Sequence, residues 1–323
     1  MTKIAKIIVF CVLSLALSQS VAAQRSGYVI SARNAETVVS EKYVRDAVSY
    51  LSAESLGGRA SGTPGGAAAA GWIDLQFREA GLETVGGTHL YGFRNSGVMC
   101  RNVIGMIPGT SSRVVILMAH FDNYGKLGDS FFPGADSNAS GVAALLQIAR
   151  MFKRMKDYHK SYDANLVFVA LDAKEKGLAG SADLWSRIQG GKLGFKPGDI
   201  SMVVNLDQLG SSLSPITKGN PDYLLMLSEE SSGRRATLVS QEKTQRIGLE
   251  LGFDYYGSKD FTRLFYRSIS DQKIFLENGI PAVMFTSGIT MLNNKPGDTP
   301  DTLDYPVLMK RIRLIYYYLE KIL

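Results

Sequence analysis

A histidine and three aspartates lie close together in the stretch AHFDNYGKLGDSFFPGADSNASG, which covers residues 119–141. His120 is followed two residues later by Asp122, and a glycine-flanked turn containing Asp136 leads into an expected helix. Histidine and carboxylate side chains are the ligand types of a catalytic metal site. Ser137, a neutral hydroxyl, stands in that turn where such a site would have another carboxylate. The stretch therefore indicates either a metal centre or one that has lost a ligand.

Further acidic residues follow two other apolar runs. The run that ends at residue 171 leads into Asp172 and Glu175, and the run that ends at residue 206 leads into Asp207. Because ligands bind outside the carboxyl ends of the strands in α/β sheets, we expect these side chains and His120 to converge on one edge. The chain has three histidines, so any metal site here must rely largely on carboxylates.

The apolar runs that carry these residues alternate with helical patterns. Residues 112–120, 164–171 and 200–206 have the length and continuous apolar character of buried strands. Residues 36–56, 67–82, 140–156 and 305–323 have apolar residues at helical spacing. This alternation predicts a three-layer α/β fold, with a mixed, mainly parallel sheet and helices on both faces. The chain shows no internal repeat, low-complexity tract or linker, so residues 24–323 are expected to form a single domain.

Residues 1–23 have the three parts of a signal peptide. Lys3 and Lys6 precede an apolar run from residue 7 to residue 17, and Ala23 ends a small-residue cleavage site. About 11 apolar residues are too few to span a bilayer as an uncleaved anchor. The pattern predicts an exported protein, periplasmic or secreted, from a Gram-negative bacterium. Cys100 alone would then remain, which leaves no internal disulfide.

Charge and hydropathy exclude some partners. The whole chain has a formal net charge of +6, and loss of the two signal-peptide lysines brings this to about +4. The basic residues are scattered rather than clustered, which argues against a nucleic-acid partner. No segment beyond the signal peptide is long and apolar enough to span a membrane. The oligomeric state has no signature in the sequence.

From about residue 43 to its end, the chain resembles the M28 family of zinc-dependent exopeptidases, aminopeptidases that share a fold with glutaminyl cyclases. The resemblance is carried by five motifs in order: AHFDNYG, PGADSNASGVAALL, AKEKGLAGS, NLDQLG and NNKPGDTPDTLD. It implies a hydrolase with two zinc ions that share a carboxylate and a water. A glutamate acts as general base in such an enzyme.

Several of the family's site residues are retained. The resemblance implies that His120 and Asp207 bind one metal ion and that Glu175 binds the other. Asp122 would orient the His120 ring without binding the metal itself. These residues would form a residual, weak metal site. The cofactor expected from the sequence is zinc or no metal at all.

Three other positions of the family pattern are substituted. Ser137 occupies the position of the carboxylate that bridges the two metals in the family pattern. Lys174 occupies the position of the general base, and Asn294 that of the C-terminal histidine. At roughly 4 Å and an effective dielectric near 20, a unit charge pair is worth about 4 kcal/mol, and an ammonium repels a dication by this amount per charge. Lys174 is therefore expected to neutralise nearby carboxylates, such as Glu175, Asp207 and Asp136, in place of metal.

Alternatives to these assignments remain open. Asp136 bridges the metals if the turn shifts by one residue, and Asp172 is a second candidate for the base. His89 and His159 are candidates for replacement ligands, although surface or loop positions are the simpler interpretation of both.

The sequence therefore supports two functions. The first is an exported, non-catalytic M28-like protein, a pseudoenzyme, that binds a peptide or a protein partner in the former active-site cleft. The second is an active zinc-dependent aminopeptidase with an atypical metal site. Whether the protein is an enzyme depends on the substituted set Ser137, Lys174 and Asn294.

Overall fold

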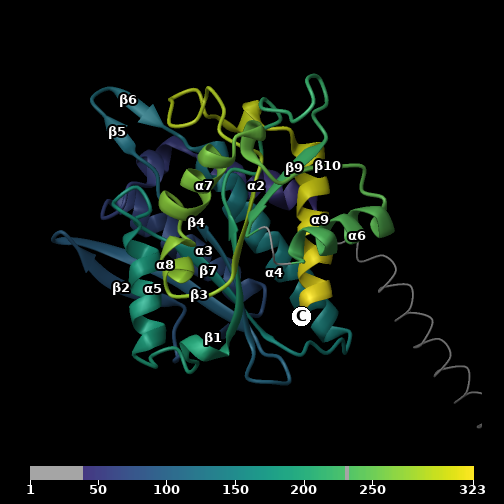
Figure 1. Cartoon of the computed structure of the whole chain (residues 1–323). Coiled ribbons are helices and arrows are strands. Elements are labelled where there is room, and N and C mark those ends of the chain that lie inside the picture. The colour runs from purple at the N-terminus through teal and green to yellow at the C-terminus, as the bar shows by residue number, and fades with distance from the viewer. Residues whose placement is uncertain (1–38, 230–232) are drawn as a thin grey trace, which may run out of the picture.

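The structure is a computed structural model that describes residues 39–229 and 233–323. The predicted signal peptide, residues 1–23, lies outside the described residues. The described helices and strands agree with the expected α/β alternation, as Figure 1 shows. The main helices are α2 (Glu41–Leu51), α3 (Pro64–Glu79), α4 (Gly141–Asp157), α5 (Ala179–Gln189), α6 (Arg234–Gln245), α7 (Lys259–Ser268), α8 (Lys273–Glu277) and α9 (Tyr305–Ile322).

A nine-stranded sheet forms the middle of the molecule, with the order β1-β3-β7-β4-β8-β11-β9-β10 and with β2 paired to β3. Its strands are β1 (Glu83–Thr84), β2 (Leu90–Asn95), β3 (Val98–Ile107), β4 (Val114–His120), β7 (Asn165–Leu171), β8 (Ile200–Leu206), β9 (Tyr223–Ser228), β10 (Glu250–Gly252) and β11 (Ala282–Thr286). A separate hairpin joins β5 (Gly125–Leu127) to β6 (Ser130–Phe132).

The sheet is mixed, and its parallel part lies at the centre. Strands β7, β4, β8 and β11 are parallel neighbours, and β9 pairs with β10 in parallel at one edge. Strands β1, β2 and β7 pair antiparallel with β3, and β11 pairs antiparallel with β9. All seven residues of β4 are buried, which explains its continuous apolar sequence, because a central parallel strand is covered on both faces.

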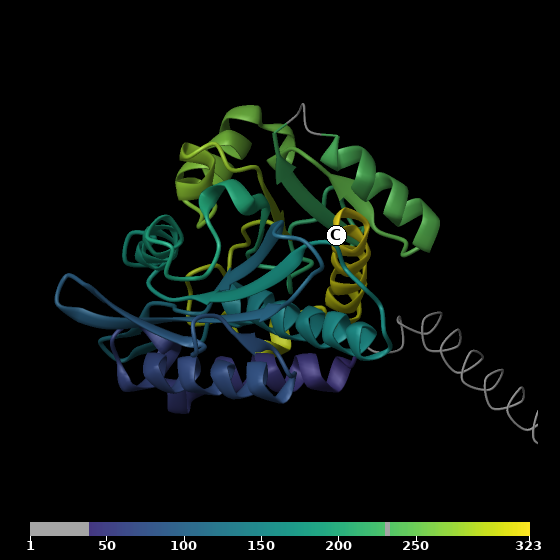
Figure 2. The ribbon, with the colours of Figure 1, turned by 90° about the horizontal axis from the view of Figure 1, so that it is seen from below.

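Helices cover both faces of this sheet, as the sequence predicts. Helices α2, α3, α4, α6 and α9 contribute to the larger core cluster on one face, and α5 and α8 contribute to a second cluster on the other. Figure 2 shows α2 and α3, coloured purple to blue, as a layer on one side of the sheet. The expected three-layer α/β architecture is therefore confirmed.

Capping residues mark where several helices begin. The Thr63 hydroxyl accepts a hydrogen bond from the backbone N–H of Gly66 at 3.1 Å, and Pro64 occupies the first position of α3. The carboxylate of Asp304 caps α9 in the same way, accepting from Val307 N at 3.2 Å. Within the described part of the chain, no helix is long and apolar enough to cross a membrane. Cys100 is a buried free thiol whose pKa burial raises to about 11.

Candidate functional site

The carboxyl ends of the central strands bring the predicted site residues to one edge of the sheet. His120 is the last residue of β4, Asp207 directly follows β8, and Lys174 lies three residues beyond β7. The Asn138 amide nitrogen donates to the backbone carbonyls of His120 at 3.2 Å and Leu206 at 2.9 Å. These two hydrogen bonds hold the ends of β4 and β8 together.

The turn before α4 has a backbone that only certain residues can adopt. Gly134 has a φ of 61°, and a Cβ atom there would lie 2.1 Å from the amide nitrogen of Asn123. The carboxylate of Asp298 accepts the backbone N–H groups of Asp136 at 2.7 Å and Ser137 at 3.0 Å. The glycine of the second motif and the aspartate of the last motif thus shape one turn.

The Arg59 side chain holds together the loops around this turn. Its side chain is fully buried and donates to the backbone carbonyls of Phe121 at 2.8 Å, Pro133 at 2.6 Å and Gly134 at 3.0 Å. Burial lowers the pKa of Arg59 to about 10, so the guanidinium remains charged at neutral pH. A rigid support of this kind is what a site on loops requires.

His120 is buried between two aspartates. Its Nε2 atom lies 3.4 Å from Asp207 Oδ1, and its Nδ1 atom lies 3.1 Å from the backbone carbonyl of Asp122. Burial and the Lys174 ammonium lower the pKa of His120, but the nearby carboxylates of Asp122 and Asp207 outweigh them and raise it to about 9. Both ring nitrogens therefore face oxygen acceptors.

The carboxylate of Asp122 supports the neighbouring loop more than it supports His120. Its two oxygens accept the backbone N–H groups of Lys174 and Glu175, each at 3.0 Å, whereas the nearer oxygen is 3.6 Å from His120 Nδ1. Asp122 does contact His120 through Nδ1, but mainly by its backbone carbonyl and not by its carboxylate. The side chain of Asp122 positions the loop that carries Lys174.

Lys174 lies among carboxylates, as the sequence predicts. Its Nζ atom is 3.0 Å from Glu175 Oε1, and the two side chains are 15% and 14% exposed. Burial lowers the pKa of Lys174, but the carboxylates of Asp207, Glu175 and Asp271 outweigh it and raise the pKa above its usual range. Burial acts to raise the pKa of Asp207, yet Lys174 and His120 hold it below its usual range. We call Lys174, Glu175, Asp207 and Asp271 the lysine–carboxylate cluster.

Asp271 is a member of this cluster that was not expected from the sequence. It is fully buried, and neither carboxylate oxygen has a hydrogen-bond partner in the part of the chain that the structure describes. Burial raises its pKa to about 6, although His120 and Lys174 act in the opposite direction. The signal in the sequence is the pair Ser270-Asp271, which resembles the family's Ser-Asp-His segment with Gln272 at the histidine position. Gln272 beside it is structural, since its Oε1 atom accepts from Asn205 at 2.8 Å.

Asp136 makes its contacts away from the cluster. Its carboxylate accepts the backbone N–H of Gly210 at 2.7 Å, that of Ser211 at 3.3 Å and the hydroxyl of Ser140 at 3.0 Å. None of its hydrogen bonds among the described residues reaches Lys174, so Asp136 does not join the cluster, contrary to the expectation from the sequence. The physical reason is that backbone donors of the loop after β8 already occupy this carboxylate.

Asp136 should make stability depend on pH. Burial, together with Asp298, raises its pKa to about 7. The folded protein therefore binds this proton more tightly than the unfolded chain does, and stability falls as pH rises from about 4 to about 7. We expect Asp136→Asn to flatten the fall in the free energy of unfolding, measured by urea denaturation at several pH values. Asp129→Asn, a change at an exposed position, should leave the slope unchanged; equal slopes in wild type and Asp136→Asn would contradict this assignment.

The substituted positions lie at the same edge of the sheet. Ser137 is buried, and its hydroxyl accepts from the amide nitrogen of Gln208 at 3.5 Å. Asn294, Lys174 and Glu175 line one cleft of about 480 Å³, and Gln208 also lies in its wall. The structure therefore brings together the positions that the resemblance assigns to one site.

The remaining candidates lie outside this cleft. The Asp172 carboxylate accepts the backbone N–H groups of Arg101 at 2.9 Å and Ala173 at 2.7 Å, and burial raises its pKa to about 6. His89 pairs with Asp74 of α3 through Nδ1 at 3.0 Å, and His159 lies in the turn after α4. None of the three is among the residues that line the cleft.

A zinc pair does not fit these residues. Among residues 39–229 and 233–323, no three histidine, cysteine, aspartate or glutamate side chains are placed so that they could hold a metal ion. The Lys174 ammonium occupies the neighbourhood of Glu175, the retained carboxylate of one half-site. His120 and Asp207, the retained pair of the other half-site, contact each other.

Known proteins share this fold and sequence pattern. The model of "Peptidase family M28" matches residues 102–319. The "Alkaline phosphatase isozyme conversion protein" of Escherichia coli (strain K12) is 28% identical over 170 residues, 47% of each chain. A "Probable zinc metalloprotease" of Pyrenophora teres f. teres (strain 0-1) is 23% identical over 294 residues, 82% of this chain and 60% of that protein. These matches span less than two-thirds of either relative's length.

The fold is also that of a solved aminopeptidase. The crystal structure of the Legionella pneumophila LapA aminopeptidase superposes with a TM-score of 0.69 and 16% sequence identity, covering 90% of this chain and 73% of that one. The family match extends over about two-thirds of the sequence and includes every retained and substituted site position. By fold and by sequence, the chain belongs to peptidase family M28.

Proposed function

We propose that this protein is an exported, non-catalytic member of the M28 family that binds a peptide or a protein segment in the former active-site cleft. The observation that carries the proposal is the ion pair between Lys174 and Glu175, with Nζ 3.0 Å from Oε1, at the positions of the family's general base and one of its metal ligands. A lysine whose pKa is raised stays protonated at neutral pH and cannot accept a proton from water.

The chemistry of the cluster supports the same proposal. Two-metal hydrolysis requires cations that polarise the substrate carbonyl and activate a water. In this site the positive charge comes from Lys174 and from His120, whose pKa is raised to about 9, and it is already neutralised by the carboxylates of Glu175, Asp207 and Asp271. A fixed ion pair does not supply an open coordination position, so no hydrolytic step is assigned to this cleft.

The cleft nevertheless has features of a binding site. Its volume of about 480 Å³ lies within the usual range for ligand pockets. Phe265 and Ile269 contribute apolar surface, and Ile269 is 47% exposed. The apolar wall matches the side chains of a peptide.

Export is part of the proposal and rests on the signal pattern of residues 1–23. We place the mature protein in the periplasm or outside the cell. No zinc is assigned to it, because the lysine–carboxylate cluster does not fit the metal.

The proposal is tested by measuring metal content, hydrolysis and binding on one preparation. We expect less than about 0.1 zinc per chain, no hydrolysis of aminoacyl chromogenic substrates, and saturable binding of peptides from a labelled library. Ile269→Arg should weaken peptide binding by about tenfold or more, since it puts a long charged side chain into the cleft wall. The matched change Leu127→Arg, at a residue that is 59% exposed outside the cleft, should have no effect.

Two results would overturn the proposal. Hydrolysis that is abolished by a chelator and restored by zinc would establish the alternative, an active aminopeptidase with an atypical site. Equal loss of peptide binding in both arginine variants would show that binding does not take place in the cleft.

A further inference from the structure

Lys273 is a cation in the wall of the cleft whose charge is only weakly compensated. It is the first residue of α8, and its side chain is 40% exposed. Its ion pair is with Glu277, at 4.0 Å, and such a long pair between exposed side chains contributes little. Glu277 is not among the described residues that line the cleft. The Lys273 ammonium is therefore available to an anionic group of a ligand.

The cleft offers no comparable partner to a cationic group. Glu175 is the acidic residue in the part of the lining that the structure describes, and it is engaged by Lys174, with Nζ 3.0 Å from Oε1. Asp207 and Asp271 are buried and do not belong to that lining. An ammonium group that entered the cleft would therefore approach Lys174 without an unpaired carboxylate to bind. The cleft favours a negative charge over a positive one.

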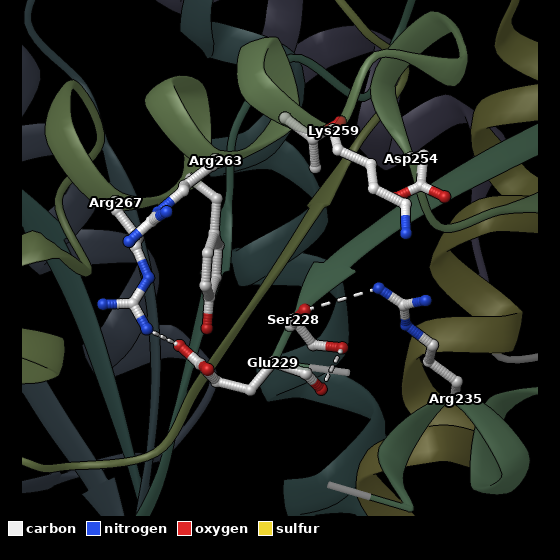
Figure 3. A pocket seen from close by; sticks show the side chains of 9 residues that line it. Ser228, Glu229, Arg235, Asp254, Lys259, Arg263 and Arg267 are labelled. Carbon is white, nitrogen blue, oxygen red and sulfur yellow. Dashed lines mark hydrogen bonds and ion pairs between the residues drawn. The ribbon is translucent and has the colours of Figure 1, made fainter. Parts of the chain in front are cut away.

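The arginines of α7 do not contribute to this balance, because they lie on a different face of the helix. Phe265 and Ser268, about one turn apart, line the cleft, whereas Arg263 and Arg267 line a separate pocket of about 420 Å³. Figure 3 shows the side chains that line that second pocket, both arginines among them. Lys273, and not the basic face of α7, supplies the available positive charge of the cleft.

Lys273 stands next to an apolar part of the cleft wall. Ile269, which is 47% exposed, and Lys273 both line the cleft and belong to the short connection between α7 and α8. A hydrogen bond from the backbone N–H of Lys273 to the carbonyl of Ser270, at 3.0 Å, closes this connection into a tight turn. Phe265, on the last turn of α7, adds further apolar surface. A ligand that contacts both ends of the turn must carry an apolar side chain close to a negative charge.

We propose that the cleft binds the C-terminal end of a peptide, with an apolar last side chain against Ile269 and Phe265 and the terminal carboxylate paired with Lys273. This inference rests on the proposed function of the cleft and specifies its ligand.

The chemistry and the size of a chain end both match the cleft. In a C-terminal residue the carboxylate and the side chain are attached to the same Cα atom, so the negative charge and the apolar group lie side by side. The volume of about 480 Å³ is that of a small-ligand pocket, which suits the last few residues of a chain better than a long segment. A peptide N-terminus would instead bring an ammonium group towards Lys174.

Isothermal titration of the full mature protein with matched short peptides tests the proposal, at low and constant ionic strength. The probes are N-acetyl-Ala-Ala-Leu with a free carboxylate, the same peptide as its C-terminal amide, Leu-Ala-Ala amide with a free N-terminus, and N-acetyl-Leu-Asp amide, whose carboxylate is on a side chain. We expect the free-carboxylate probe to bind about fivefold more tightly than each of the others, because a partly exposed charge pair contributes up to this factor.

Two variants separate the contact with Lys273 from general attraction. Lys273→Met should weaken the free-carboxylate probe about fivefold and change the affinity for its amide by less than about twofold, because the amide lacks the charge that Lys273 binds. A general loss of structure would weaken both probes. Lys176→Met, a matched charge loss at an exposed position next to the cleft, should leave both affinities within about twofold of the wild type.

The contradicting outcomes distinguish this inference from the proposed function. Equal binding of acid and amide, tighter binding of the free N-terminus, or equal binding of N-acetyl-Leu-Asp amide would overturn the inference and leave peptide binding in place. Equal weakening of the free-carboxylate probe by Lys176→Met would mean unspecific attraction to a basic surface. Binding of library peptides without binding of the free-carboxylate probe would refute the inference alone, whereas absence of binding by every peptide would refute the proposed function as well.

Discussion

The triple variant Ser137→Asp, Lys174→Glu and Asn294→His should bind zinc roughly a thousandfold more tightly than the wild type. Lys174 and Asn294 line the same cleft, and Ser137 reaches it through Gln208 at 3.5 Å. The change replaces an ammonium by a carboxylate and adds two ligands to His120, Glu175 and Asp207. Removal of one unit of repulsion at roughly 4 Å is worth about 4 kcal/mol, which corresponds to the stated factor.

The measurement is a competition titration against a chromophoric zinc chelator, with zinc content determined by mass spectrometry. The matched control is the double variant Ser137→Asp and Asn294→His, which retains Lys174 and should bind far more weakly than the triple variant. Two tightly held zinc ions per wild-type chain would refute the view that the ammonium replaces metal. A triple variant that gains no zinc would mean that these three positions do not belong to one metal site.

Lys174→Met should lower the free energy of unfolding by about 3 kcal/mol or more at neutral pH. The methionine retains an apolar stem, but Glu175, Asp207 and the buried Asp271 lose the Lys174 ammonium, and only His120 remains as a cation near the two aspartates. Removal of one partner from a buried ion pair leaves an uncompensated charge, which typically costs about 3–5 kcal/mol. Urea denaturation followed by circular dichroism measures the change.

Lys176→Met is the matched control, since Lys176 is exposed on the same loop, and it should change stability by less than about 0.5 kcal/mol. Adding Glu175→Gln to Lys174→Met should recover part of the lost stability, because it removes one of the uncompensated carboxylates. If Lys174→Met proves as stable as Lys176→Met, the ammonium does not neutralise the cluster, and the basis of the proposed function fails.

Much of the fold could be predicted because its signals are local. The continuous apolar run of β4 and the capping residues Thr63 and Asp304 mark element types and boundaries directly. The distribution of parallel and antiparallel pairing could not be predicted in the same way. Strand β3 pairs antiparallel with β7, and β11 with β9, and such pairings depend on contacts between segments far apart in the chain.

The candidate site was predictable in part. Motif spacing placed His120, Lys174 and Glu175 at one sheet edge, and the structure brings them there. Motif spacing could not reveal that the backbone N–H of Gly210 binds the carboxylate of Asp136. Nor could it reveal that Asp271, instead of Asp136, is one of the carboxylates that act on Lys174. A carboxylate's direction depends on which donors surround it, and those donors come from other loops.

The sequence by itself determined which residue types stand at the site: a serine, a lysine and an asparagine where the family has two carboxylates and a histidine. Their identities are local facts, and they already argue against metal. Only the tertiary structure decided that Lys174 pairs with Glu175. Burial and the distances between charges set pKa values and electrostatic energies, and both quantities exist only once distant segments have packed together.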